Sequence, residues 1–104
     1  MRVRGQVFWE WADPLLHSRS SELCLQDRGT ANVQVRMSSA GSIQLFIGIY
    51  SPNGAMLFEE SFDTCLGQTM TQASAWGMEK AKVWLESRPA EPLSVGKINL
   101  SLKK

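Results

Sequence analysis

The feature that most constrains the fold is an apolar stretch in the middle of the chain, residues 43–50, which reads IQLFIGIY. Its aliphatic residues recur at every second position, which is typical of a β-strand. One face carries Ile43, Leu45, Ile47 and Ile49. The other face carries Phe46 and Tyr50, so both faces of the strand need cover. We therefore predict that this segment is the central strand of a sheet.

A strand is also predicted on each side of this segment. Residues 31–37 alternate apolar with polar side chains, which indicates a half-solvated strand with Ala31, Val33, Val35 and Met37 on its apolar face. Residues 55–62 read AMLFEESF and carry Met56, Phe58 and Phe62 on one side. Before them, the sequence SPNG favours a turn, because proline fixes φ and Asn-Gly tolerate a positive φ. The three segments predict an antiparallel meander.

A helix is predicted over residues 69–87. Thr69 and Gln72 have the spacing of a capping box at its start, and Arg88-Pro89 ends it. Small and apolar residues recur at helical spacing and should pack on one face of the sheet: Met70, Ala73, Gly77, Ala81 and Trp84, with Leu85 adjoining. Trp76 and Met78 flank this stripe, and we expect them to be exposed.

The remaining segments add one strand at each end and one open choice. Residues 3–11 alternate so that Trp9 and Trp11 share a face while Phe8 stands on the opposite, otherwise polar face, which predicts a strand. Residues 97–102 carry Ile98 and Leu100 on one face, which predicts another strand. Its flanking lysines suit a sheet edge, and it could pair within the chain or with another copy. Residues 14–26 fit either a short helix that follows Asp13 or a short strand after a serine-rich loop.

These elements define the expected class. We predict one α+β domain over residues 1–104, in which an antiparallel sheet built on the three-stranded meander packs one main C-terminal helix on one face. Strands from the two ends of the chain extend this sheet. A chain of 104 residues with 43% hydrophobic residues buries enough surface to fold without a metal or a disulfide.

The order of these elements is similar to that of double-stranded-RNA-binding domains. A helix starting at Pro14, three strands and the C-terminal helix resemble the α-β-β-β-α arrangement of that family. The resemblance implies a fold and not an activity, because the family opens its second helix with lysines whereas residues 68–74 read QTMTQAS. The family also carries a histidine between its first two strands, where this chain reads SSAGS.

Charge and composition exclude several classes of protein. The 11 basic and 10 acidic side chains leave a net charge of +1, so nucleic acid is not an expected partner. We expect neither a signal peptide nor a membrane span. The chain is therefore expected to be a small cytoplasmic protein of bacterial origin. Cys24 and Cys65 are then expected to be buried free thiols rather than a disulfide.

No arrangement of side chains predicts catalysis. His17 is the single histidine and lies beside serines, but a nucleophile needs an oriented base. Glu59 and Glu60 should lie on opposite faces of their strand, which argues against a metal site shared with Asp63. We therefore expect no enzyme activity, no cofactor, no metal and no small-molecule substrate.

The sequence thus favours a non-enzymatic protein-interaction module that binds a protein partner or itself, as a homodimer. The candidate interaction surface comprises Phe8, Trp76, Ile98 and Leu100. The alternative is a nucleic-acid-binding domain of the double-stranded-RNA-binding type.

Overall fold

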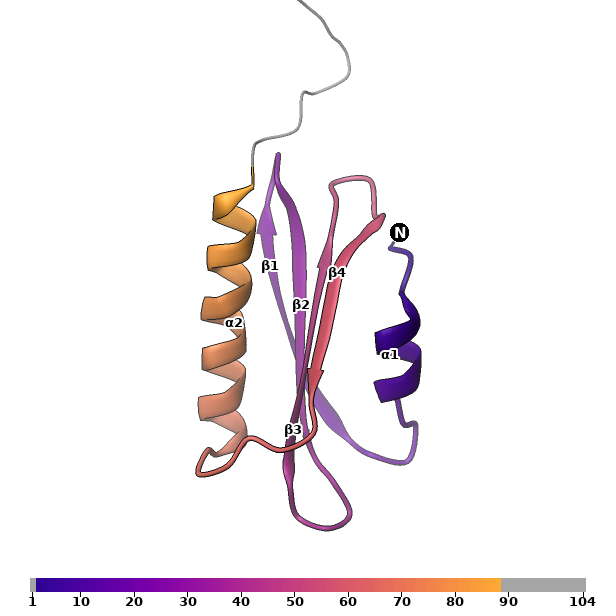
Figure 1. The fold of residues 1–104 in the computed structure, drawn as a ribbon, viewed down its shortest axis with the longest axis vertical. Helices are drawn as coiled ribbons and strands as arrows, with labels where there is room; N and C mark the ends of the chain where they lie inside the picture. The colour runs from indigo at the N-terminus through magenta and orange to yellow at the C-terminus, as the bar shows by residue number, and fades with distance from the viewer. Residues whose placement is uncertain (1, 89–104) are drawn as a thin grey trace, which may run out of the picture.

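The computed structural model describes residues 2–88. Along the chain the elements are α1 (Gln6–Trp11), β1 (Ser18–Leu25), β2 (Gly29–Met37), β3 (Ile43–Tyr50), β4 (Met56–Phe62) and α2 (Met70–Ser87). The strands form one antiparallel sheet in the order β1-β2-β3-β4. The two helices lie on opposite faces of this sheet (Figure 1). The predicted α+β class, the meander and the packed C-terminal helix are confirmed, whereas the strand predicted over 97–102 lies outside the described residues.

The main core lies between the sheet and α2. The inward faces of β2 and β3 meet the small-residue stripe of α2, and the buried side chains are those of Ala31, Val33, Val35, Leu45, Ile47, Ile49, Ala73, Ala81 and Leu85. A β-carbon added at Gly77 would lie 2.9 Å from Val33 Cγ1 and 3.1 Å from Leu45 Cδ1. The absence of a side chain at Gly77 therefore lets α2 approach the sheet closely.

The helix α2 begins and ends as predicted. Thr69 accepts a hydrogen bond from the Gln72 backbone, and the Gln72 side chain accepts one from the Thr69 backbone, which completes the capping box. Trp76 is exposed as expected, but Met78 is half-buried and packs against the core. The last buried member of the stripe is Leu85, while Trp84 is half-buried and stacks on Phe58.

The N-terminal strand prediction is wrong. Residues 6–11 form a helix, so Trp9 is 66% exposed and Trp11 only 6% exposed instead of sharing a face. The reason is a tertiary contact, because the Glu59 carboxylate accepts hydrogen bonds from the backbone N–H groups of Gly5 (2.9 Å) and Phe8 (3.2 Å). The first N–H groups of a helix have no partner within it, so a carboxylate from β4 stabilises this short helix.

For residues 14–26 the sequence left a helix and a strand as alternatives, and the structure has a strand there, Ser18–Leu25. Ser18–Leu25 pair with β2 along their whole length, from Ser18 opposite Arg36 to Leu25 opposite Gly29. The serines therefore belong to β1 and not to a loop. Pairing with β2 supplies the hydrogen bonds that the weak local pattern of this segment could not indicate.

Two further expectations about the strands need correction. The strand at residues 31–37 is not half-solvated, because Asn32 and Arg36 on its polar face are buried beneath the N-terminal segment and α1. A register shift between β3 and β4 sets Met56 opposite Tyr50, on the face away from Phe58. A β-bulge of this kind breaks the alternation on which a sequence pattern relies.

The two cysteines and the two helices bear on two further expectations, a pair of buried free thiols and the lack of a membrane span. Cys24 and Cys65 are free thiols, as predicted, but Cys24 is exposed and Cys65 is half-buried. Within residues 2–88, neither helix combines the length and the apolar character needed to cross a bilayer.

Candidate functional site

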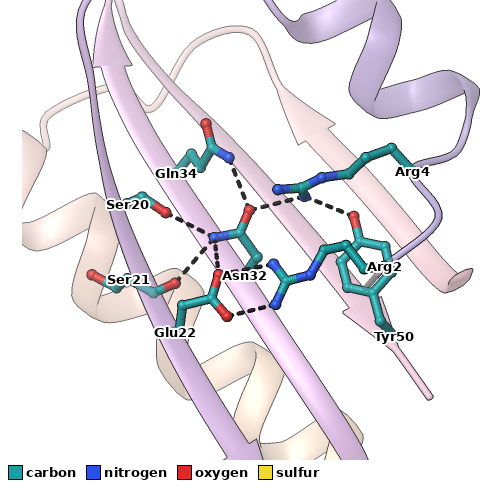
Figure 2. A network of polar contacts seen from close by, with 8 residues as sticks. All are labelled: Arg2, Arg4, Ser20, Ser21, Glu22, Asn32, Gln34 and Tyr50. Atoms are coloured by element: carbon teal, nitrogen blue, oxygen red, sulfur yellow. Dashed lines mark hydrogen bonds and ion pairs between the residues drawn. The ribbon is translucent and has the colours of Figure 1, made fainter. Parts of the chain in front are cut away.

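The face of the sheet that carries α1 is polar and is organised by Asn32. This side chain is 1% exposed, and Figure 2 shows it at the centre of a hydrogen-bond network. Its Oδ1 accepts from Arg4 (3.0 Å) and Gln34 (2.8 Å), and its Nδ2 donates to Ser20 (2.8 Å) and Glu22 (2.8 Å). A buried amide with its donors and acceptors satisfied fixes the position of its neighbours.

The residues that precede α1 are held to the sheet by two arginines. Arg2 donates two hydrogen bonds to the Glu22 carboxylate, at 2.6 and 2.8 Å, and its guanidinium lies 5.0 Å from the centre of the Tyr50 ring. The hydrogen bond from Arg2 holds the pKa of Glu22 below its usual value. The Arg4 guanidinium lies 4.1 Å from the centre of the Phe8 ring and donates a hydrogen bond to Tyr50 of β3. The two arginines therefore hold the segment before α1 in place across β1 to β3.

The start of α1 is connected to this network through Tyr50. The Tyr50 hydroxyl accepts a hydrogen bond from Arg4 (2.9 Å) and donates one to Glu59 (2.8 Å). Glu59 in turn accepts from the first amides of α1. Burial, together with the hydrogen bond to Glu59, raises the pKa of Tyr50 to about 12.

The end of α1 is held by Arg36 from β2. Its guanidinium lies 3.8 Å from the centre of the Trp11 ring, and Nη1 donates to the Trp11 carbonyl oxygen at 2.5 Å. Nε donates to Gln44 of β3 at 2.8 Å. Burial lowers the pKa of Arg36 from its ordinary value. One buried arginine therefore bridges the helix end and two strands.

Beside these contacts lies an open hollow of about 540 Å³. Its walls are the C-terminal end of α1 and the following loop, and its floor is the polar face of β1 and β2. The lining residues are Phe8, Trp9, Trp11, Ala12, Asp13, Pro14, Leu16, Ser18, Gln34 and Arg36. We call it the aromatic hollow.

The aromatic hollow combines an apolar wall with hydrogen-bonding groups. Phe8 packs edge-on against Trp9 (5.1 Å between ring centres) and against Phe46 (5.3 Å), which fixes the wall. Trp9 stands at the rim with two thirds of its surface exposed. Within the described residues the Trp11 indole N–H is buried and has no hydrogen-bond partner, an arrangement that normally costs free energy. The surface suits recognition, because it offers apolar area together with the polar side chains of Ser18 and Gln34, which can fix the orientation of a bound group.

A smaller hollow of about 180 Å³ lies on the other side of the sheet, between the end of β4 and α2. Its main apolar residues are Phe62, Cys65, Leu66 and Trp76. Trp76 packs edge-on against Phe62 with 5.2 Å between ring centres, and the Lys80 ammonium lies 5.4 Å from the Trp76 ring. Trp76 is therefore partly committed to intramolecular contacts.

The structure separates the residues of the predicted interaction surface. Phe8 lines the aromatic hollow on the α1 face, whereas Trp76 lies on the α2 face. Phe8 is half-buried beneath Arg4 and does not stand on an otherwise polar face as predicted, because its segment is a helix. Ile98 and Leu100 lie outside the described residues. Sequence reasoning missed Trp9 and Arg36, since it assigned Trp9 to the core face of a strand and Arg36 to solvent.

The candidate catalytic groups of the sequence remain apart. His17 is exposed next to β1. Glu59 faces α1, while Glu60 faces Lys80 of α2 at 3.7 Å, so the two carboxylates lie on opposite faces as predicted. Among residues 2–88, no group of His, Cys, Asp and Glu side chains gathers as metal ligands would.

Comparison of the chain with protein-family models, with curated proteins and with solved structures gives no match. The structure itself defines an α+β domain whose α1 face carries an organised polar network.

Proposed function

We propose that the protein is a non-enzymatic interaction module that binds an extended segment of a partner protein in the aromatic hollow. The observation that carries the proposal is the exposure of Trp9, 66% of its surface, at the rim of a hollow whose floor contains Arg36. Tryptophan is enriched among the residues that dominate binding energy at protein interfaces. A tryptophan exposed to this degree leaves a large apolar area in contact with water unless a partner covers it.

The lining of the hollow indicates the chemistry of its occupant. The apolar wall formed by Phe8, Trp9 and Leu16 suits an apolar or proline side chain, because the two aromatic rings offer flat apolar area. Ser18 and Gln34 on the floor can exchange hydrogen bonds with the backbone of an extended segment. The hollow contains both Arg36 and Asp13, so no single charge on the partner is favoured.

Rigid support favours binding at this place. The network around Asn32 and the bridge from Arg36 hold the two ends of α1, so the wall is formed before a partner arrives. A preformed site loses less conformational entropy on binding than a mobile one.

We also propose that the protein self-associates through a different surface and that it is cytoplasmic, a location that the free thiols of Cys24 and Cys65 support.

The test begins with selection of a random peptide library on the immobilised protein. The dissociation constants of the selected peptides are then measured by calorimetry for the wild type and for the variant Trp9→Ala. We expect Trp9→Ala to weaken binding roughly 30-fold, which corresponds to about 2 kcal/mol for a dominant interface residue.

The matched control is Trp76→Ala, because Trp76 is also an exposed tryptophan but lies on the other face. Binding by this variant should equal that of the wild type. Peptides that bind Trp9→Ala as tightly as the wild type would refute the proposed site, as would a library that yields no binder. Thermal unfolding of both variants checks that the fold is retained.

A further inference from the structure

The outer edge of β1 is open. In the part of the chain that the structure describes, β1 pairs with β2 on one side and with no strand on the other. None of its side chains is fully buried, and its pairing with β2 runs over Ser18–Leu25 without a bulge. A long regular edge of this kind presents a row of backbone N–H and C=O groups to another strand.

The two edges of the sheet differ in their protection. β4 contains a bulge and two adjacent glutamates, and α1 packs against it. β1 reads SRSSELCL and contains neither proline nor lysine, the residues that most often block edge pairing, and of its two charged residues Glu22 is already paired with Arg2. The edge available for pairing is therefore that of β1.

We propose that the protein forms a symmetric dimer in which β1 pairs antiparallel with β1 of a second copy, centred on Ser21. The two sheets then join into one continuous sheet. This proposal develops the self-association part of the proposed function, and it does not depend on the aromatic hollow.

Symmetry restricts the register. Residues directly opposite each other in an antiparallel pair lie on the same face of the sheet. A two-fold axis perpendicular to the sheet leaves each residue on the same face of the sheet in both copies. The axis must therefore pass beside one residue, which then lies opposite the same residue of the second copy, and not between two successive residues. For Ser18–Leu25, the longest overlaps allowed by this rule are centred on Ser21 or on Glu22.

Charge then selects between these two registers. Centring on Glu22 sets its carboxylate directly opposite Glu22 of the second copy, which is destabilising. Centring on Ser21 sets two small hydroxyl side chains opposite each other and places Arg19 opposite Leu23 of the second copy. The register centred on Ser21 therefore opposes no like charges directly.

The surroundings of β1 leave room for an added strand. A hollow of about 380 Å³ lies between β1 and α2, lined by Arg19, Ser20, Ser21, Thr71, Ser74 and Ala75. In the proposed register Leu23 of the second copy lies opposite Arg19, beside this hollow. The added strand would thus bring apolar cover to a part of β1 that α2 leaves open.

The first test measures mass in solution by sedimentation equilibrium over micromolar to millimolar concentrations of the full chain. We expect a dimer for the wild type and a loss of that dimer over the same range for Ser21→Lys, which sets two lysines opposite each other. The control is Ser61→Lys, an equivalent change at the exposed Ser61 of β4, which should remain dimeric. A monomeric wild type, or a dimer that Ser21→Lys leaves intact, would overturn the proposal.

The second test determines the register by cross-linking. In a background where Cys24 and Cys65 are replaced by serine, single cysteines at positions 20, 21 and 22 are joined with a short bifunctional thiol reagent. Ser21→Cys should give the cross-linked dimer fastest. A preference for position 20 or 22 would overturn the register that charge selects.

A third arm distinguishes other occupants of the edge. The chain lacking residues 97–104 should still form the dimer through β1, whereas loss of the dimer on this deletion would assign self-association to that segment instead. The peptide-binding assay on the aromatic hollow is read separately. Failure of the dimer therefore leaves the partner-binding proposal untouched, and the converse also holds.

Discussion

The Arg4 guanidinium donates a hydrogen bond to the Tyr50 hydroxyl across 2.9 Å, from the start of the chain to the end of β3. The same nitrogen donates to Asn32 at 3.0 Å, so one arginine joins the segment before α1 to two strands. Tyr50 passes the connection on to Glu59, which accepts hydrogen bonds from the first amides of α1. The position of the aromatic hollow therefore depends on this chain of contacts.

The titration of Tyr50 should report on this chain of contacts. The pKa of Tyr50 is raised to about 12, and it is the single tyrosine of the chain, so the ultraviolet absorbance of tyrosinate follows it alone. The native state holds Tyr50 neutral to a higher pH than the unfolded chain does. The contribution of Tyr50 to the free energy of unfolding is therefore fully present below about pH 10 and is lost as the pH rises through about 12. A midpoint near the ordinary value of 10.0 in the folded protein would contradict this arrangement.

Acid should weaken the contact between Arg2 and Glu22. The pKa of Glu22 is lowered, first by the hydrogen bond from Arg2, so its contribution to stability is present above its ordinary value of 4.5 and is lost as the pH falls through the lowered value. We expect Glu22→Gln to reduce the difference between the free energies of unfolding at about pH 7 and about pH 3. Urea denaturation at the two values measures it. An unchanged difference would show that Glu22 titrates as in the unfolded chain.

The two tryptophans of α2 should differ in their effect on stability. Trp84 stacks on Phe58 and packs against the core, whereas Trp76 is 43% exposed. We expect Trp84→Ala to lower the free energy of unfolding by about 3 kcal/mol, at the lower end for buried aromatic residues because Trp84 is half-buried. Trp76→Ala should cost about 1 kcal/mol. Equal shifts in the denaturation midpoint would contradict this orientation of α2.

Replacement of Arg36 by lysine should destabilise the end of α1. Lysine keeps the charge but cannot donate at once to the Trp11 carbonyl and to Gln44 while stacking on the indole. The expected loss is about 2 kcal/mol, since hydrogen bonds from a charged, buried group are lost. Urea denaturation measures the loss, and the quenching of tryptophan fluorescence by iodide should increase as Trp11 becomes accessible. Arg19→Lys is the control, because Arg19 is exposed.

Duplex RNA and DNA should not bind at physiological salt. The first turn of α2 contains the residues MTQA without a basic side chain, and Arg2, Arg4 and Arg36 are engaged in intramolecular contacts. Phosphate contacts from free basic residues supply most of the affinity of nucleic-acid-binding proteins. Fluorescence anisotropy with a labelled duplex measures this. Micromolar binding that weakens steeply with added salt would favour the double-stranded-RNA-binding alternative.

Three parts of the fold could be predicted because their signals are local. The alternation in residues 43–50 requires a strand covered on both faces, and the capping box at Thr69 sets the start of α2. The spacing of Ala73, Gly77 and Ala81 identifies the face of α2 that packs on the sheet. Each signal depends on residues within a few positions of one another, so the sequence displays it directly.

The candidate site could not be predicted, because contacts between distant residues create it. Residues 3–11 alternate like a strand, yet the carboxylate of Glu59, more than forty positions later, stabilises a helix there and turns Trp9 outward. Burial of Arg36 depends in the same way on the carbonyl of Trp11. The sequence by itself determined the meander and α2, whose periodicity is local. Only the tertiary structure decided α1, the strand β1 and the aromatic hollow, because their hydrogen bonds and cover come from elements far along the chain.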